Sequence, residues 1–92
     1  MNQHFNNKGF NYFTGATTLP ATCLNDSGDT VPCIYYGIQA ETAFTINATG
    51  TAWAKGYQGD NDFLGVEHPA GTYLMRFSSL VISAGTGIAL IE

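Results

Sequence analysis

The sequence predicts a small all-β domain, a single sandwich or barrel of about six to eight short antiparallel strands with little or no helix. Short apolar and β-branched segments recur at roughly the 8–12-residue spacing typical of such folds, with turn residues between them. No stretch of about ten residues or more carries apolar residues at helical spacing without a Gly or Pro break. The chain has 92 residues, which is the length of one domain. We expect that domain to span 10–92, after a flexible polar arm over 1–9.

The aromatic segment FNYF, residues 10–13, predicts the first short strand. The preceding arm, MNQHFNNKG, has Phe5 as its one strong apolar residue. Two interpretations stay open: the arm frays in solution, or Phe5, Phe10 and Phe13 dock onto a neighbouring subunit.

The later strands are predicted where apolar segments lie between turn residues. Pro20 and Pro32 indicate edges or bends, because proline cannot donate to a β-ladder. Alternation in TYLMRF (72–77) places Tyr73, Met75 and Phe77 on one face. The expected strands lie within 17–24, 30–36, 42–47, 51–57, 63–66, 72–77, 80–82 and 88–91, and the turns within 25–29, 47–50, 58–62, 67–71 and 83–87.

The charge of the chain excludes several classes of function. Three Lys and Arg against seven Asp and Glu give a formal net charge of −4, and Lys8, Lys55 and Arg76 are far apart in the sequence. Nucleic-acid binders cluster cations against phosphates, and anionic membranes attract basic segments, so neither partner is expected. No apolar run reaches the roughly 18–20 residues of a membrane span, and the polar start predicts no signal peptide, hence synthesis in the cytoplasm.

Charged residues make up only 11% of the chain, against roughly 25% in an average soluble domain. Thr, Asn, Gly and Ser supply most of the polarity. Surfaces without long charged side chains bury easily, because interface cores are depleted in Lys, Glu and Asp. The composition therefore fits subunit contacts, although an ordinary acidic β domain is the alternative.

Cys23 and Cys33 are symmetric about Gly28. A hairpin with a three-residue loop over 27–29 would place the two cysteines opposite each other, in reach of a disulfide. Such a bridge would stabilise by roughly 2–3 kcal/mol. Since thiols stay reduced in the cytoplasm, two free thiols are an equal expectation.

Neither a metal, a cofactor nor an active site is expected. Two Cys and two distant His lack zinc spacing, and the acidic loop 60–62 departs from the EF-hand pattern at Leu64. No motif links a nucleophile to a base. We expect the protein not to be an enzyme.

An aromatic ligand patch is a further candidate. Trp53 and Tyr57 share one strand face, and the polar groups of Asp60, Asn61 and Asp62 follow at once, an arrangement that suits a glycan. The alternative is that both rings belong to the core.

The repeated strand openings Gly50-Thr51, Gly71-Thr72 and Gly85-Thr86, the Lys-poor and Thr/Asn/Gly-rich composition and the ending GTGIALIE are similar to small virion proteins of tailed bacteriophages. These are capsid decoration (cement) proteins, head fibres and fibre tips, and the likeness covers residues 17–92. It implies a β-rich homo-oligomer, usually a trimer, that stands on the capsid.

We therefore expect a structural virion protein that binds the outside of a viral shell as a homotrimer, with itself and the major capsid protein as partners. Arg76 is expected to pair with Glu41 or Glu67 at the rim of a contact. The alternative is a receptor- or glycan-binding tip module. The expected subunit or capsid contacts are Phe5, Phe10, Phe13, Arg76, Leu90 and Ile91.

Overall fold

The computed structural model describes residues 9–24 and 27–92 and confirms an all-β fold. Its described residues form eleven strands and one 3-10 turn. The number of strands exceeds the expected six to eight because several contain only two or three residues. The expected arm over 1–9, with Phe5, lies outside the described residues apart from Gly9, where the first strand begins.

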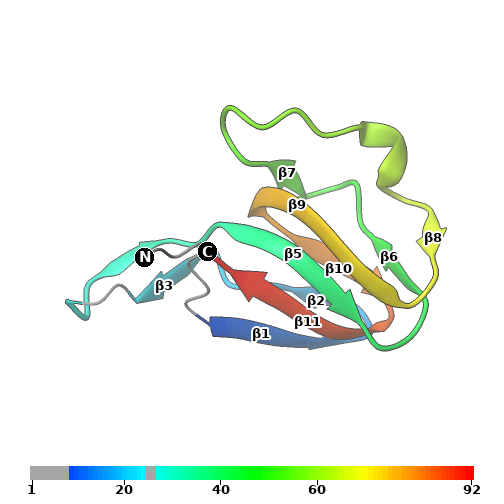
Figure 1. Ribbon diagram of the computed structural model, residues 1–92, viewed down its shortest axis with the longest axis horizontal. Helices are drawn as coiled ribbons and strands as arrows, with labels where there is room; N and C mark the ends of the chain where they lie inside the picture. Colours follow the sequence, from blue (N-terminus) through cyan, green and yellow to red (C-terminus); the bar gives the residue numbers. More distant parts are fainter. Residues whose placement is uncertain (1–8, 25–26) are drawn as a thin grey trace.

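Two antiparallel sheets face each other (Figure 1). The five-stranded sheet has the order β1 (Gly9–Thr14), β11 (Thr86–Ile91), β5 (Tyr35–Ala40), β9 (Gly71–Ser79) and β7 (Ala52–Trp53). The four-stranded sheet has the order β2 (Thr17–Thr18), β10 (Val81–Ala84), β6 (Phe44–Ile46) and β8 (Glu67–His68). From β5 to β11 the chain changes sheet at every connection, so the strands that pair within a sheet are never consecutive in sequence.

A separate hairpin of β3 (Thr22–Leu24) and β4 (Thr30–Pro32) extends from one end of the sandwich (Figure 1). The segment between β7 and β8 arches beyond the edge of the five-stranded sheet. Both features project from the two-layer body and make the molecule elongated, with extents of 36 × 25 × 24 Å.

The core lies between the two sheets. The five-stranded sheet contributes Phe13, Tyr35 and Phe77, and the four-stranded sheet contributes Phe44 and Ile46, all essentially inaccessible to solvent. Their spacing follows the two-residue period of a strand, which sends alternate side chains to the same face. Phe44 and Ile46 of β6 accordingly lie on the same, buried face.

Among the described core residues, Tyr35 is the one that carries a hydroxyl, and this hydroxyl makes two hydrogen bonds. Its hydroxyl donates to the Pro20 carbonyl oxygen at 2.6 Å and accepts from Asn11 Nδ2 at 3.0 Å. These bonds remove most of the penalty of burying a hydroxyl. Burial raises the pKa of Tyr35 to about 12.

The prediction of a strand at 63–66 is wrong. Asn61–Phe63 is a 3-10 turn, and the next strand is β8, in the stretch where a turn was expected. The cause is Asp60, whose Oδ1 accepts from the Asp62 amide at 2.9 Å while its carbonyl accepts from the Phe63 amide at 3.0 Å. An aspartate that bonds the amide two residues ahead closes a tight turn in preference to an extended strand.

The strand expected over 51–57 is also shorter than predicted. It ends at Trp53, and the Tyr57 amide then donates to the Ala54 carbonyl at 3.0 Å. Gly56 has a φ of +82°, which glycine adopts without strain. The turn still brings the Tyr57 ring against Trp53, with ring centroids 5.9 Å apart.

Candidate functional site

One apolar surface of the protein is left uncovered by the fold: the side of the five-stranded sheet that points away from the four-stranded sheet. We call it the outer face. Three of the five large hydrophobic residues exposed in the described chain lie on it, namely Phe10 (59% exposed), Tyr12 (55%) and Leu74 (69%). An antiparallel sheet with one solvated side ordinarily presents polar residues there. The outer face therefore departs from what solubility alone requires.

The strand register aligns these side chains in one row across four strands. Phe10 lies opposite Leu90, Leu90 opposite Gly37, and Gly37 opposite Leu74. Gly37 has no side chain, and a Cβ placed on it would lie 3.0 Å from Leu74 Cδ2 and 3.5 Å from Leu90 Cδ1. The two leucines thus reach over the glycine and close the gap. The result is a continuous apolar row.

A second row beside the first adds to the same surface. It runs from Tyr12 to Ile88, Gln39 and Thr72. Neither row contains a charged side chain. With strands about 4.8 Å apart, the four strands make a surface about 15 Å wide.

Arg76 lies at the margin of the outer face. Its ion-pair partner differs from the one that was expected. Arg76 Nη2 pairs with Glu92 Oε1, whereas Glu41 or Glu67 had been expected. Glu92 follows the last strand, and its amide donates to the Ile34 carbonyl at 2.8 Å, which places its side chain beside β9. The sequence did not indicate this pair, because β9 and the residue after β11 become neighbours only when both strands pair with β5.

The expected contact residues divide between two faces. Phe10 and Leu90 belong to the outer apolar row, whereas Phe13 and Ile91 are core residues. The reason is the period of two: residues one or three positions apart in a strand point to opposite sides of the sheet. Of these four residues, only Phe10 and Leu90 therefore lie on the outer face.

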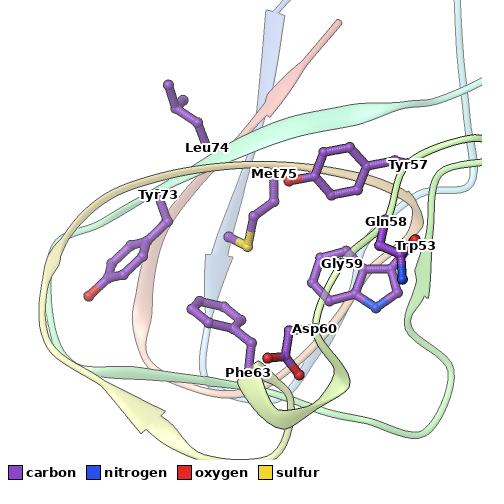
Figure 2. A pocket seen from close by; sticks show the side chains of 9 residues that line it. All are labelled: Trp53, Tyr57, Gln58, Gly59, Asp60, Phe63, Tyr73, Leu74 and Met75. Carbon is purple, nitrogen blue, oxygen red and sulfur yellow. The ribbon is translucent and has the colours of Figure 1, made fainter.

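A second concave site lies between β9 and the arching segment (Figure 2). It is an open hollow of about 320 Å³. Figure 2 shows the Met75 side chain between two groups of rings, Tyr57 with Trp53 and Tyr73 with Phe63. Asp60 is the one charged residue of its lining.

Three of the expected ligand-patch residues, Trp53, Tyr57 and Asp60, meet in this hollow, whereas Asn61 and Asp62 do not line it. The Asn61 Oδ1 instead accepts from Trp53 Nε1 at 2.8 Å. Phe77 stacks on the indole with centroids 4.7 Å apart and planes at 18°. Gly59 also covers the indole, since a Cβ on it would lie only 2.1 Å from Trp53 Cδ2. Trp53 thus packs against the core, as one interpretation expected, and it also lines the hollow; a ligand there stays a prediction.

The two cysteines adjoin but are not bonded to each other. The expected hairpin exists, yet Cys23 lies opposite Val31 rather than Cys33, so the predicted register was wrong by two residues. Leu24 lies opposite Thr30, so five residues rather than three separate the paired strand ends. A shift of two residues keeps Cys33 on the same face as Cys23, as a diagonal neighbour. Burial, followed by the adjacent Cys23, raises the pKa of Cys33 to about 11.

Sequence reasoning missed several residues of both sites. Tyr12, Leu74 and Ile88 on the outer face and Phe63, Tyr73 and Met75 in the hollow were not singled out. Alternation along β1 and β9 carried part of the signal, because it grouped Tyr73 with Met75. It could not show which side of each strand the second sheet covers.

A scan against protein-family models matched nothing, and searches of curated proteins and of solved structures gave no match either. Within residues 9–24 and 27–92, no helix has the length and apolar character needed to cross a membrane. In the same residues, no three His, Cys, Asp or Glu side chains gather as a metal-binding group.

Proposed function

We propose that this chain is a non-catalytic structural protein that self-associates through its outer face, and that the oligomer decorates and stabilises a viral capsid. The observation that carries the first part is the uncharged apolar row of Phe10, Leu90, Gly37 and Leu74. The second part rests on the similarity of the sequence to phage decoration proteins.

Charge favours a second copy of the chain as the occupant of the outer face. The chain carries a net charge of −4, so two copies repel each other unless they meet where acidic groups are absent. Asp60 and Asp62 lie in the arching segment and Asp29 directly precedes β4, so none of them belongs to either row. The two rows themselves hold no carboxylate, and the Glu92 carboxylate at their margin is paired with Arg76.

The apolar area is of the right order for a reversible contact. Phe10, Tyr12 and Leu74 each expose roughly 100 Å², so two copies bury roughly 600 Å² of apolar surface through these side chains. At about 25 cal/mol per Å² this contributes about 15 kcal/mol before the losses of association, which are about 4–15 kcal/mol. Polar residues around the rows add contact area. We therefore expect association that depends on protein concentration.

Light scattering on a size-exclusion column, over a range of protein concentrations, tests the self-association. We expect a mass that rises above one chain as the concentration increases; the resemblance to decoration proteins implies an oligomer of three chains. Tyr12→Asp should give the mass of one chain, because it places a carboxylate in the contact. Leu24→Asp is the matched control, since Leu24 is 66% exposed but belongs to the hairpin. A wild-type monomer at millimolar concentration would refute the proposal.

The capsid part has its own test. Purified protein is mixed with particles of the encoding virus that lack it, and the particles are sedimented. We expect wild-type protein to sediment with the particles and to raise the temperature at which they open. Protein that stays in the supernatant at saturating concentration would overturn this part while leaving self-association intact.

A further inference from the structure

The hollow beneath the arching segment shares only Leu74 with the outer face, and its walls are held in place by contacts within the protein. Trp53 is fixed by its Phe77 stacking and by the Nε1 bond to Asn61. Tyr73 is fixed by its hydroxyl, which donates to the Pro69 carbonyl at 2.8 Å. A preformed wall lowers the entropy lost when a ligand binds.

Phe63 is held equally firmly on the opposite side. His68 stacks on it with ring centroids 3.8 Å apart and planes at 15°, and His68 Nε2 lies 2.8 Å from the Phe63 carbonyl oxygen. The Phe63 ring also lies 5.8 Å from Tyr73 at an interplanar angle of 59°. Since His68 covers one side of the ring, the side turned away from His68 is the one that reaches the hollow. The ring pairs Trp53–Tyr57 and Phe63–Tyr73 are thus inclined to each other within the pair, and Met75 lies between the two pairs.

The charge of the lining has a single sign. Asp60 contributes a carboxylate, and neither Lys nor Arg lines the hollow. One Asp60 oxygen is engaged with the Asp62 amide, which leaves the second oxygen for a ligand. The Tyr57 hydroxyl makes no hydrogen bond within the described part of the chain and stands beside the same opening. An occupant that carries charge must therefore be a cation.

The same contacts disfavour a sugar as the occupant. A pyranose ring needs an open aromatic face and several unengaged polar groups. The indole of Trp53 already packs against Phe77 and Gly59, and the Asn61 carbonyl oxygen is engaged by Trp53 itself. What the hollow offers is ring surface, a polarisable thioether and one carboxylate.

We propose that this hollow binds a quaternary ammonium group, such as the choline head group. The rings of Tyr57, Phe63 and Tyr73 attract an alkylated cation through their quadrupoles, and the methyl groups of the cation pack as apolar surface. The Met75 thioether is a soft contact for those methyl groups. Asp60 balances the charge at the rim. A volume of about 320 Å³ holds such a head group with part of its chain.

The chain contains one tryptophan, Trp53, so its fluorescence reports on this hollow directly. We would titrate the full chain with choline and, in parallel, with 3,3-dimethylbutanol, the uncharged isostere of choline. We expect saturable quenching by choline in the millimolar range or below, and binding at least fivefold weaker for the isostere. Equal binding of the two compounds would overturn the proposal, because the charge would then not matter.

Variants locate the binding. Asp60→Asn keeps the oxygen that accepts the Asp62 amide but removes the charge, and should weaken choline binding about five- to tenfold. Tyr57→Ala should weaken it tenfold or more, with the fold unchanged by circular dichroism. Asp62→Asn is the matched control and should bind as wild type, because Asp62 does not line the hollow. Equal loss in the Asp60 and Asp62 variants would assign the effect to overall charge and refute the site.

Two further arms separate the sources of the ligand. Soluble phosphocholine and phosphatidylcholine vesicles carry the same head group, and only the vesicles allow co-sedimentation. Binding in either arm supports the proposal and identifies a free or a membrane-borne head group. Quenching by a panel of neutral mono- and disaccharides, with none by choline, would overturn it in favour of a sugar site.

Discussion

The two sides of the five-stranded sheet are both apolar, yet they have different physical roles. The inner side, with Phe13, Tyr35 and Phe77, is sealed by the four-stranded sheet. The outer face, with Phe10 and Leu74, meets nothing in the described chain that removes it from water. The hydrophobic effect acts on both, but only the inner side gains from it within one molecule. Apolar residues inside thus contribute to folding, while those outside are available for association.

Replacing an inner aromatic residue is expected to have the largest effect on stability. Phe77→Ala removes a ring that is 0% exposed and that stacks on Trp53. The free energy of unfolding should fall by about 3–5 kcal/mol. Urea denaturation monitored by circular dichroism measures the change. A loss below about 1 kcal/mol would show that the inner side is not the stabilising one.

Adding one methyl group at each of two glycines of the same sheet compares how tightly its two sides are packed. A Cβ on Gly87 would lie 2.4 Å from the Gln39 carbonyl oxygen, so Gly87→Ala forces the backbone to move and should cost about 1–3 kcal/mol. Gly37→Ala should cost less, because its closest contacts, Leu74 Cδ2 and the Tyr73 carbonyl oxygen, are both at 3.0 Å and the leucine tip can move. Thermal melting of both variants gives the order. The reverse order would contradict the packing described here.

Alkaline pH should weaken the core through Cys33. Its pKa is about 11 in the folded state, against 9.0 for an unperturbed thiol. Below about pH 9 the thiol is protonated in both states, and stability is unaffected. Between about pH 9 and 11 the unfolded thiol loses its proton while the folded one keeps it, so the free energy of unfolding falls, by about 1–2 kcal/mol.

Urea midpoints at pH 8 and pH 10.5 measure this loss. Cys33→Val is the control: it keeps an apolar side chain and should lose less stability over the same interval. The part that remains comes from Tyr35, whose folded pKa of about 12 lies above its ordinary value of 10.0 and acts in the same direction. An equal loss in wild type and Cys33→Val would remove Cys33 from the explanation.

The smallest effect on stability is expected on the outer face. Phe10→Ala truncates a ring that is 59% exposed, so the free energy of unfolding of the monomer should change by about 0.5 kcal/mol or less. The same variant should weaken self-association, as measured by sedimentation equilibrium. Comparing it with Phe77→Ala separates the two roles of the sheet. Unchanged association in Phe10→Ala would place the contact elsewhere.

Much of the fold could be predicted because the relevant signals are local. The alternation of TYLMRF placed Tyr73, Met75 and Phe77 on one side, and the structure agrees. The errors arose where side chains compete with local pattern. Asp60 closes a turn in a segment whose hydrophobic pattern predicts a strand. In the hairpin, five residues rather than three separate the paired strand ends. Neither choice is visible in hydrophobic periodicity.

The candidate sites were only partly predictable for a different reason. Trp53, Tyr57 and Asp60 are neighbours in sequence, so their meeting could be expected. Tyr73 and Met75 join them from β9, which reaches β7 only through long-range pairing. In the same way, Phe10 and Leu74 share a row because β11 and β5 lie between their strands.

The sequence by itself determined that this chain is all-β, that its surface carries little charge and which residues of each strand share a side. These follow from composition and from the two-residue period, both of which are local properties. The tertiary structure alone decided which side of the sheet is covered and which side is left open. That choice depends on pairing between distant strands, because the chain changes sheet at each step from β5 to β11. No local sequence pattern indicates which of the two apolar sides of the five-stranded sheet will be covered by the four-stranded sheet.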